Sequence, residues 1–264
     1  MKRVSIIILV ALLSLILVSC SDKKIDDLTS INDYIAPSYT HKIETGTLTF
    51  AENVGQTAII TDYVGLYTAH EVTVPDTIAE RTVSVIGQEA FYYCTSITKI
   101  ELPSTITVIG DWAFAGCTSL ETIVIPASVT SIGKGAFYGC TSLKSIVFEG
   151  EALVLVDDFA FGNCTELEAI DLPSSVSSLG VQAFLNCESL TSFTSPESLK
   201  SIGDMAFYGC GALNADGALV LNESITEIGK FAFTGINKEY ITVPDGSYAA
   251  EYVAAMKATE ETES

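Results

Sequence analysis

The chain has 264 residues, and 48% of them are hydrophobic, which is enough to bury the core of one elongated domain or two compact ones. Its formal charge is −20, because 33 acidic residues stand against 13 basic ones. So acidic a surface repels phosphate backbones and anionic lipid headgroups, which argues against nucleic acid as a partner and against electrostatic docking to a membrane.

Residues 1–19 are typical of an export signal. Lys2 and Arg3 precede an apolar run from Val4 to Val18, which is shorter than the ~20 residues that cross a bilayer. The run ends in Leu17-Val18-Ser19-Cys20, which resembles the lipobox of bacterial lipoproteins. That resemblance implies cleavage before Cys20 and acylation of its thiol and amine, which together give stable anchoring. The alternative is an ordinary signal peptide followed by a chance cysteine.

Residues 20–45 are predicted to be a lipid-anchored tether, because they are polar and sustain no apolar periodicity. In lipoproteins of Gram-negative bacteria, an Asp after the lipidated cysteine often directs retention in the inner membrane. Ser21 stands there in this chain. The resemblance therefore favours the outer membrane, and we expect a surface-exposed protein held to the membrane by its lipid alone.

Residues 46–85 are expected to form an N-terminal cap. Residues 47–50 and 57–61 alternate between apolar and polar side chains, which predicts an antiparallel hairpin over the first repeat. Val72-Thr73-Val74-Pro75 then begins an incomplete copy of the pattern that follows.

Residues 86–244 are predicted to be a repeat array with a period of about 23 residues. An Ala-Phe pair recurs in one phase, an Ile-Gly pair usually precedes it, and a cysteine usually follows the phenylalanine by three residues. No single copy can bury its apolar side chains alone, whereas stacked copies align them into continuous ladders. The recurring phenylalanines are Phe91, Phe114, Phe137, Phe161, Phe184, Phe207 and Phe233.

One copy divides into three pieces. Residues 121–125 alternate and predict a short strand, which Pro126 ends because it lacks a ladder donor. Residues 128–133 return the chain with two further apolar anchors, and residues 134–139 form a tight turn. We therefore expect an α/β repeat, β-dominated, in which the strands form one parallel sheet with ~4.8 Å between neighbours.

The pattern Ile-Gly-x-x-Ala-Phe-x-x-Cys-x-x-Leu-x-x-Ile-x-Leu-Pro resembles the BspA-like leucine-rich repeats of bacterial surface proteins. The resemblance covers roughly residues 64–244 and implies a right-handed leucine-rich-repeat solenoid and a role in adhesion or protein recognition. The chain departs from the pattern at Val156-Asp157, which replaces Ile-Gly, and at Ile236, which replaces cysteine. The copy around residues 214–217 carries three extra residues.

Residues 245–264 are expected to close the solenoid. Asp245-Gly246 predicts a turn, Ser247 is a candidate helix N-cap, and Tyr248 to Lys257 predicts a short helix over the last repeat, with a frayed tail beyond.

The six remaining cysteines occupy one repeat position, and we predict that they are buried free thiols with a packing role. Disulfides between neighbouring copies and a zinc site are the alternatives. A zinc site is disfavoured because thiolates in a row do not provide tetrahedral coordination. Ile at position 236 favours packing, because it forms no disulfide. The six are Cys94, Cys117, Cys140, Cys164, Cys187 and Cys210.

No residue set indicates catalysis. The two histidines, His41 and His70, lie outside the complete repeats, and no glycine-rich phosphate loop is present. Residues 149–151 and Asp157-Asp158 are acidic but lack the alternating oxygen ligands of a calcium loop. We therefore expect a non-enzymatic protein with no catalytic residues, no cofactor and no metal.

The first candidate binding surface is the outward face of the predicted strands, which is small, β-branched and nearly uncharged. The alternative is that these are simply good strand residues. The candidates are Lys99, Glu101, Thr122, Val124, Ser145, Val147, Ala169, Asp171, Ser192, Thr194, Tyr240 and Thr242, with Ala218 and Val220 in the same pattern. A second candidate surface consists of the tyrosines beside the phenylalanines, which could anchor a protein or stack on sugars: Tyr92, Tyr93, Tyr138 and Tyr208.

The hypothesis that follows is a monomeric surface module for adhesion or protein interaction. A glycan-binding accessory lipoprotein and a structural spacer without a specific ligand are the competing hypotheses. Fold alone does not choose between them.

Overall fold

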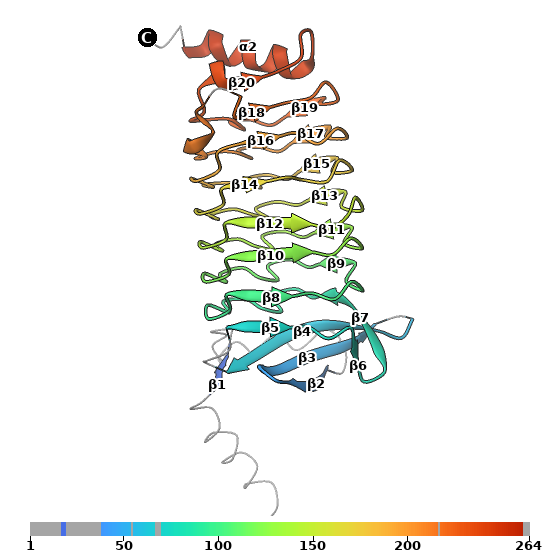
Figure 1. The fold of residues 1–264 in the computed structure, drawn as a ribbon. Coiled ribbons are helices and arrows are strands. Elements are labelled where there is room, and N and C mark those ends of the chain that lie inside the picture. Colours follow the sequence, from blue (N-terminus) through green and yellow to red (C-terminus); the bar gives the residue numbers. More distant parts are fainter. Residues whose placement is uncertain (1–16, 20–37, 54, 67–69, 216, 261–264) are drawn as a thin grey trace, which may run out of the picture.

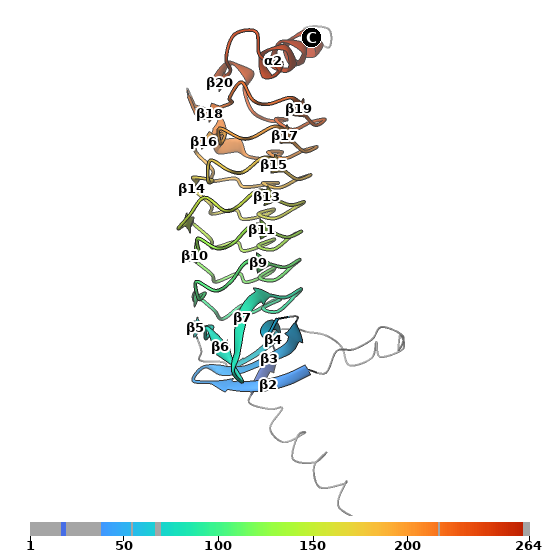
Figure 2. The same ribbon diagram turned by 90° about the vertical axis from the view of Figure 1, so that its right-hand side faces the viewer.

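The computed structural model describes residues 17–19, 38–53, 55–66, 70–215 and 217–260, and these form a column of stacked coils between two caps (Figures 1 and 2). The β-dominated parallel solenoid predicted from the repeat is confirmed. Most of the predicted signal peptide, Cys20, the tether up to residue 37 and the last four residues lie outside the described residues. Among the described residues, no helix is both long and apolar enough to cross a membrane.

The N-terminal cap is an antiparallel sheet. Its strands are β2 (Ser38–Ile43), β3 (Gly46–Asn53) and β4 (Thr57–Leu66), and the short β1 (Leu17–Ser19), which lies within the predicted signal peptide, pairs with β4. The predicted hairpin is β3–β4, in which the alternate residues Leu48, Phe50, Ala58 and Ile60 are buried. Strand β2 pairs with β3, so residues 38–43 belong to the cap and not to the predicted tether.

The cap sheet continues directly into the solenoid. Strand β4 pairs in parallel with β7 (Arg81–Ile86), which also pairs with the short β6 (Thr77–Ile78). From β7 onward the same sheet takes one two-residue strand from each coil. These strands are β9 (Val108–Ile109), β11 (Ser131–Ile132), β13 (Leu155–Val156), β15 (Ser178–Leu179), β17 (Ser201–Ile202) and β19 (Glu227–Ile228).

The strands predicted from the sequence form a second set, so the expectation of a single parallel sheet was wrong. The return segment also pairs from coil to coil, because each of its strands places one side chain in the core and aligns its backbone with the next copy. The second set consists of β5 (Glu71–Thr73), β8 (Lys99–Glu101), β10 (Thr122–Ile125), β12 (Ser145–Phe148) and β14 (Ala169–Ile170), followed by β16 (Phe193–Thr194), β18 (Leu219–Val220) and β20 (Ile241–Thr242). An isolated bridge between Ala169 and Ser192 links the two parts.

A stack of aromatic rings forms the centre of the core. The seven repeat phenylalanines are buried, and neighbouring rings are stacked with centroids 5.2 to 5.8 Å apart. Tyr63 of β4 contacts Phe91 at one end, and Tyr252 contacts Phe233 at the other. The caps therefore extend the same ladder that holds the coils together.

The repeat cysteines form a second buried line beside the rings. Each described thiol from Cys117 to Cys210 donates to the carbonyl of the repeat phenylalanine in the preceding coil, as in Cys140 Sγ to Phe114 O at 3.1 Å. The prediction of free thiols is confirmed for Cys117, Cys140, Cys164, Cys187 and Cys210. It was wrong for Cys94, which is buried but disulfide-bonded.

The C-terminal cap is α2 (Tyr248–Glu260), which lies across the last coil (Figure 1). Ser247 is the predicted N-cap, and its Oγ accepts from the Ala250 N–H at 3.1 Å. The Tyr252 hydroxyl donates to the Gly229 carbonyl at 2.9 Å, which ties the helix to the coil below. Two short 3-10 helices, η1 (Gly211–Leu213) and η2 (Lys238–Tyr240), occupy the less regular last coils.

Candidate binding surfaces

The outward side chains of the second strand set form aligned columns. Thr122 is in register with Lys99 on one side and Ser145 on the other, and Ser145 is in register with Ala169. A parallel column brings Val124 beside Val147. In every case the residue between the two columns, such as Ile123 or Ile146, is buried. We call this surface the strand face.

Most of the predicted strand-face residues are exposed, so the structure brings them to one surface. Ala218 and Val220 are exceptions in the coil that carries three extra residues: Ala218 is buried at 4% exposure and Val220 is half-buried. Tyr240 is half-buried because it belongs to η2 and not to a strand. The exposed predicted residues are Lys99, Glu101, Thr122, Val124, Ser145, Val147, Ala169, Asp171, Ser192, Thr194 and Thr242.

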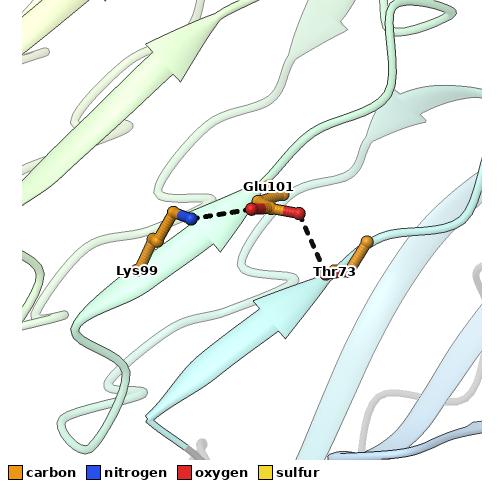
Figure 3. A network of polar contacts seen from close by, with 3 residues as sticks. All are labelled: Thr73, Lys99 and Glu101. Atoms are coloured by element: carbon orange, nitrogen blue, oxygen red, sulfur yellow. Dashed lines mark hydrogen bonds and ion pairs between the residues drawn. The ribbon is translucent and has the colours of Figure 1, made fainter.

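A small polar network lies at the cap end of this face (Figure 3). Lys99 Nζ is 2.7 Å from Glu101 Oε1, and the Thr73 hydroxyl donates to Glu101 Oε2 at 3.2 Å. The Lys99 ammonium lowers the pKa of Glu101, and the Glu101 carboxylate raises the pKa of Lys99. The two charges thus offset each other within one strand, which leaves the face close to neutral there.

The centre of the strand face is apolar. Val124 is 41% exposed and Val147 is 50% exposed. Neither side chain packs in the core, so both present apolar surface to solvent. Thr122 and Ser145 flank them, with their hydroxyl oxygens 3.4 Å apart. This neutral patch contrasts with a chain whose formal charge is −20.

The predicted tyrosines do not form one cluster. Tyr93 and Tyr208 are exposed, whereas Tyr92 and Tyr138 are half-buried. Tyr92 contacts Tyr93 edge-on, with centroids 4.5 Å apart. Tyr138 instead contacts two residues that the sequence analysis missed, which are Trp112 at 5.7 Å and Phe159 at 6.4 Å between centroids. The overlooked indication was an aromatic residue two positions before each Ala-Phe phenylalanine, at 112 and 159.

A hollow of about 250 Å³ lies between the last coil and α2. Its lining includes Phe231, Ile236 and the buried Lys238, whose ammonium donates to the Met256 carbonyl in the last turns of the helix. That bond joins the last coil to α2, which is a structural role. Within the residues that the structure describes, no three His, Cys, Asp or Glu side chains are grouped to hold a metal ion.

The coiled column, its aligned strands and its two caps define a solenoid repeat protein that presents extended surfaces. The match to the model of the BspA type leucine-rich repeat region, over residues 69–188 and 151–254, is more specific. The chain belongs to this family.

Solved structures agree with that assignment. A leucine-rich-repeat protein of T. pallidum is 30% identical with a TM-score of 0.66, over 78% of this chain and 92% of that one. A leucine-rich cell surface protein of Faecalibacterium prausnitzii is 28% identical with a TM-score of 0.64, over 79% of this chain and 55% of that one. A leucine-rich-repeat protein of Eubacterium ventriosum is 29% identical with a TM-score of 0.60, over 75% and 52%. No curated protein sequence is similar enough to count as a relative.

Proposed function

We propose that this protein is a non-enzymatic surface module that binds a protein partner on the strand face and thereby mediates adhesion. Leucine-rich-repeat proteins of this kind are generally protein-interaction modules. The observation that carries the proposal is the exposed Val124–Val147 pair, set among Thr122 and Ser145 on an acidic molecule. Exposed apolar side chains on a flat, rigid surface can be desolvated by a partner at little cost in conformational entropy.

A matched pair of substitutions tests this proposal. Val147→Asp places a charge in the middle of the strand face, whereas Val154→Asp places one at an equally exposed valine (49% against 50%) in the segment leading to the other sheet. Biolayer interferometry against purified extracellular-matrix and bacterial surface proteins measures the effect. Val147→Asp should weaken a specific interaction by on the order of tenfold or more, and Val154→Asp should leave it unchanged. Equal binding by both variants would mean that the partner docks elsewhere, and no binding to any protein would favour a spacer.

We further propose that Cys20 carries a lipid anchor that holds the protein at the outer membrane, facing outward. The support is the sequence Leu17-Val18-Ser19-Cys20 at the end of an apolar run and Ser21 after it. Mass spectrometry of the N-terminal peptide should show a diacylglyceryl thioether that is absent from Cys20→Ser. Lipidation occupies the Cys20 sulfur, so a peptide in which Cys20 is part of any disulfide would contradict the anchor.

A further inference from the structure

A second surface runs along the tight turns of the coils, where aromatic rings of one coil lie over glycines of the next. A Cβ added at Gly135 would be 2.4 Å from two ring carbons of Trp112, and one added at Gly116 would be 3.1 Å from three ring carbons of Tyr93. Each glycine occupies the same repeat position as the ring that covers it. The glycines therefore provide the space in which the neighbouring rings lie flat.

This arrangement leaves the rings partly exposed. Tyr93 is 50% exposed and Phe231 is 60% exposed, whereas Trp112 is half-buried. The ring of Trp112 lies against Gly135 on the inner side, and the rest of the ring surface is partly open to solvent. The contact is clearest for Trp112, because Cε3, Cζ3 and Cδ2 of its indole are all within 2.8 Å of the Cβ position added at Gly135.

Trp112 stands at a strained backbone position. Its φ is 56°, in the left-handed region, which is unfavourable for a bulky side chain. Gly135 adopts a φ of 59° at the same position one coil later without that strain. The fold thus accepts glycine here, and the tryptophan is not needed to form the turn.

The ring of Tyr138 lies beside the ring of Trp112. Its ring is inclined at 73° to that of Trp112, with centroids 5.7 Å apart. The carboxylate of Asp111, next to Trp112 in the chain, is exposed at the same turn, and its Oδ1 accepts from the Lys134 N–H at 3.0 Å. Trp112 provides an apolar ring surface, Tyr138 provides a second ring inclined to it, and Asp111 provides a hydrogen-bond acceptor. Together they suit a ligand ring that has an apolar face and hydroxyl groups at its edge.

We propose that this turn edge binds a neutral glycan, with one sugar ring stacked on Trp112 against Tyr138 and its hydroxyls donating to Asp111. The C–H groups on the face of a pyranose ring carry partial positive charge, which the negative face of an indole attracts. Bases of single-stranded nucleic acid also stack on aromatic platforms, but their phosphates are repelled by a chain of formal charge −20. Lys134 lies over the ring of Phe159, with its ammonium 5.4 Å from the ring centroid, so this cation covers a different ring from that of Trp112.

The chain's single tryptophan makes the site directly observable, because its emission reports on Trp112 alone. The probes are three neutral polysaccharides (laminarin, mannan and dextran), with polygalacturonate, oligo-dT and a decaproline peptide for comparison. At least one neutral polysaccharide should change the emission saturably and retard the full chain in an affinity gel. Tyr138→Ala should weaken that binding by on the order of tenfold.

Trp112→Gly is the decisive variant, because Gly135 shows that glycine suits this backbone and the variant should fold. It should lose retardation in the gel while its thermal unfolding remains cooperative. Val147→Asp, on the strand face, should bind the polysaccharide normally, which separates this proposal from the proposed protein interaction. The proposal is overturned if no neutral polysaccharide binds, if Trp112→Gly binds like the natural chain, or if oligo-dT, polygalacturonate or decaproline is preferred.

Discussion

The repeated cysteine shows how one residue can serve a whole row of coils. Its thiol fills a small space beside the phenylalanine ladder and donates to a main-chain carbonyl, so the position is satisfied both sterically and by hydrogen bonding. Burial raises the pKa of Cys117 and of Cys164 to about 12, since a thiolate there would lose its hydration. These thiols are therefore packing residues and not nucleophiles.

Reactivity follows from this burial. In the folded protein at pH 8, Cys117, Cys140, Cys164, Cys187 and Cys210 should resist alkylation by iodoacetamide over hours, and all five should react within minutes in 6 M guanidinium. Mass spectrometry of the alkylated peptides reads each site. Rapid labelling of the folded chain at Cys140 or Cys164 would show that the coils open locally.

The raised pKa of the buried thiols makes the free energy of unfolding depend on pH. A thiol whose pKa is about 12 when folded, against 9.0 for an ordinary thiol, contributes stability that is fully present below pH 9 and lost as the pH rises toward 12. Urea unfolding at pH 8, 9, 10 and 11 should therefore show a falling free energy of unfolding. Cys164→Ala should be less stable at pH 8 but should lose less between pH 9 and 11, and parallel curves for the two proteins would contradict this account.

At the scale of the element, the aromatic ladder couples the coils to one another and to both caps. Phe137 has zero exposure and contacts the rings of Phe114 and Phe161. Phe137→Ala should lower the free energy of unfolding by ~3–5 kcal/mol, because it removes a buried ring from between two others. Chemical denaturation measures the change, and a loss below 1 kcal/mol would show that the ladder does not hold the coils together.

The helix α2 covers the last coil, and its start depends on one side chain. Replacing Ser247 with Ala removes the acceptor of the Ala250 N–H and should cost ~1 kcal/mol of stability. Ser247→Asp retains an acceptor at the helix N-terminus and should cost much less. Thermal melts of the two variants test this, and equal melting temperatures would mean that the cap bond is dispensable.

Sequence reasoning succeeded where the repeat itself supplied the evidence. A period near 23 residues made Phe114, Phe137 and Phe161 equivalent, and two-residue alternation then predicted which strand side chains point outward. It failed for the sheet formed by the return segments, because strands as short as Ser131–Ile132 show no alternation. It also missed β2, whose side chains are largely exposed, so that its sequence lacks an apolar pattern.

The strand face could be predicted from the sequence, whereas the aromatic contacts at the turns could not. Val124 and Val147 could be predicted as neighbours because register follows from the period. Trp112 and Phe159 could not, because their position varies freely between copies, and their relation to Tyr138 depends on how rings lie across the coils. The role of a residue at a repeat position that differs between copies can be inferred only when its neighbours in the next coil are known.

At the scale of the whole molecule, the solenoid separates stability from recognition. The core of rings and thiols runs along the inside of the column, while the strand face and the turn edge occupy different sides of each coil. A change on either surface should therefore alter binding without altering the fold, which is why Val147→Asp and Trp112→Gly can be tested independently.

Hydroxyl-radical footprinting of the protein with and without a bound protein partner tests the central claim most directly. If the strand face is the binding surface, Val124 and Val147 should be protected by the partner while Val154 is labelled equally in both states. Protection of Val154 with continued labelling of Val124 and Val147 would contradict the claim.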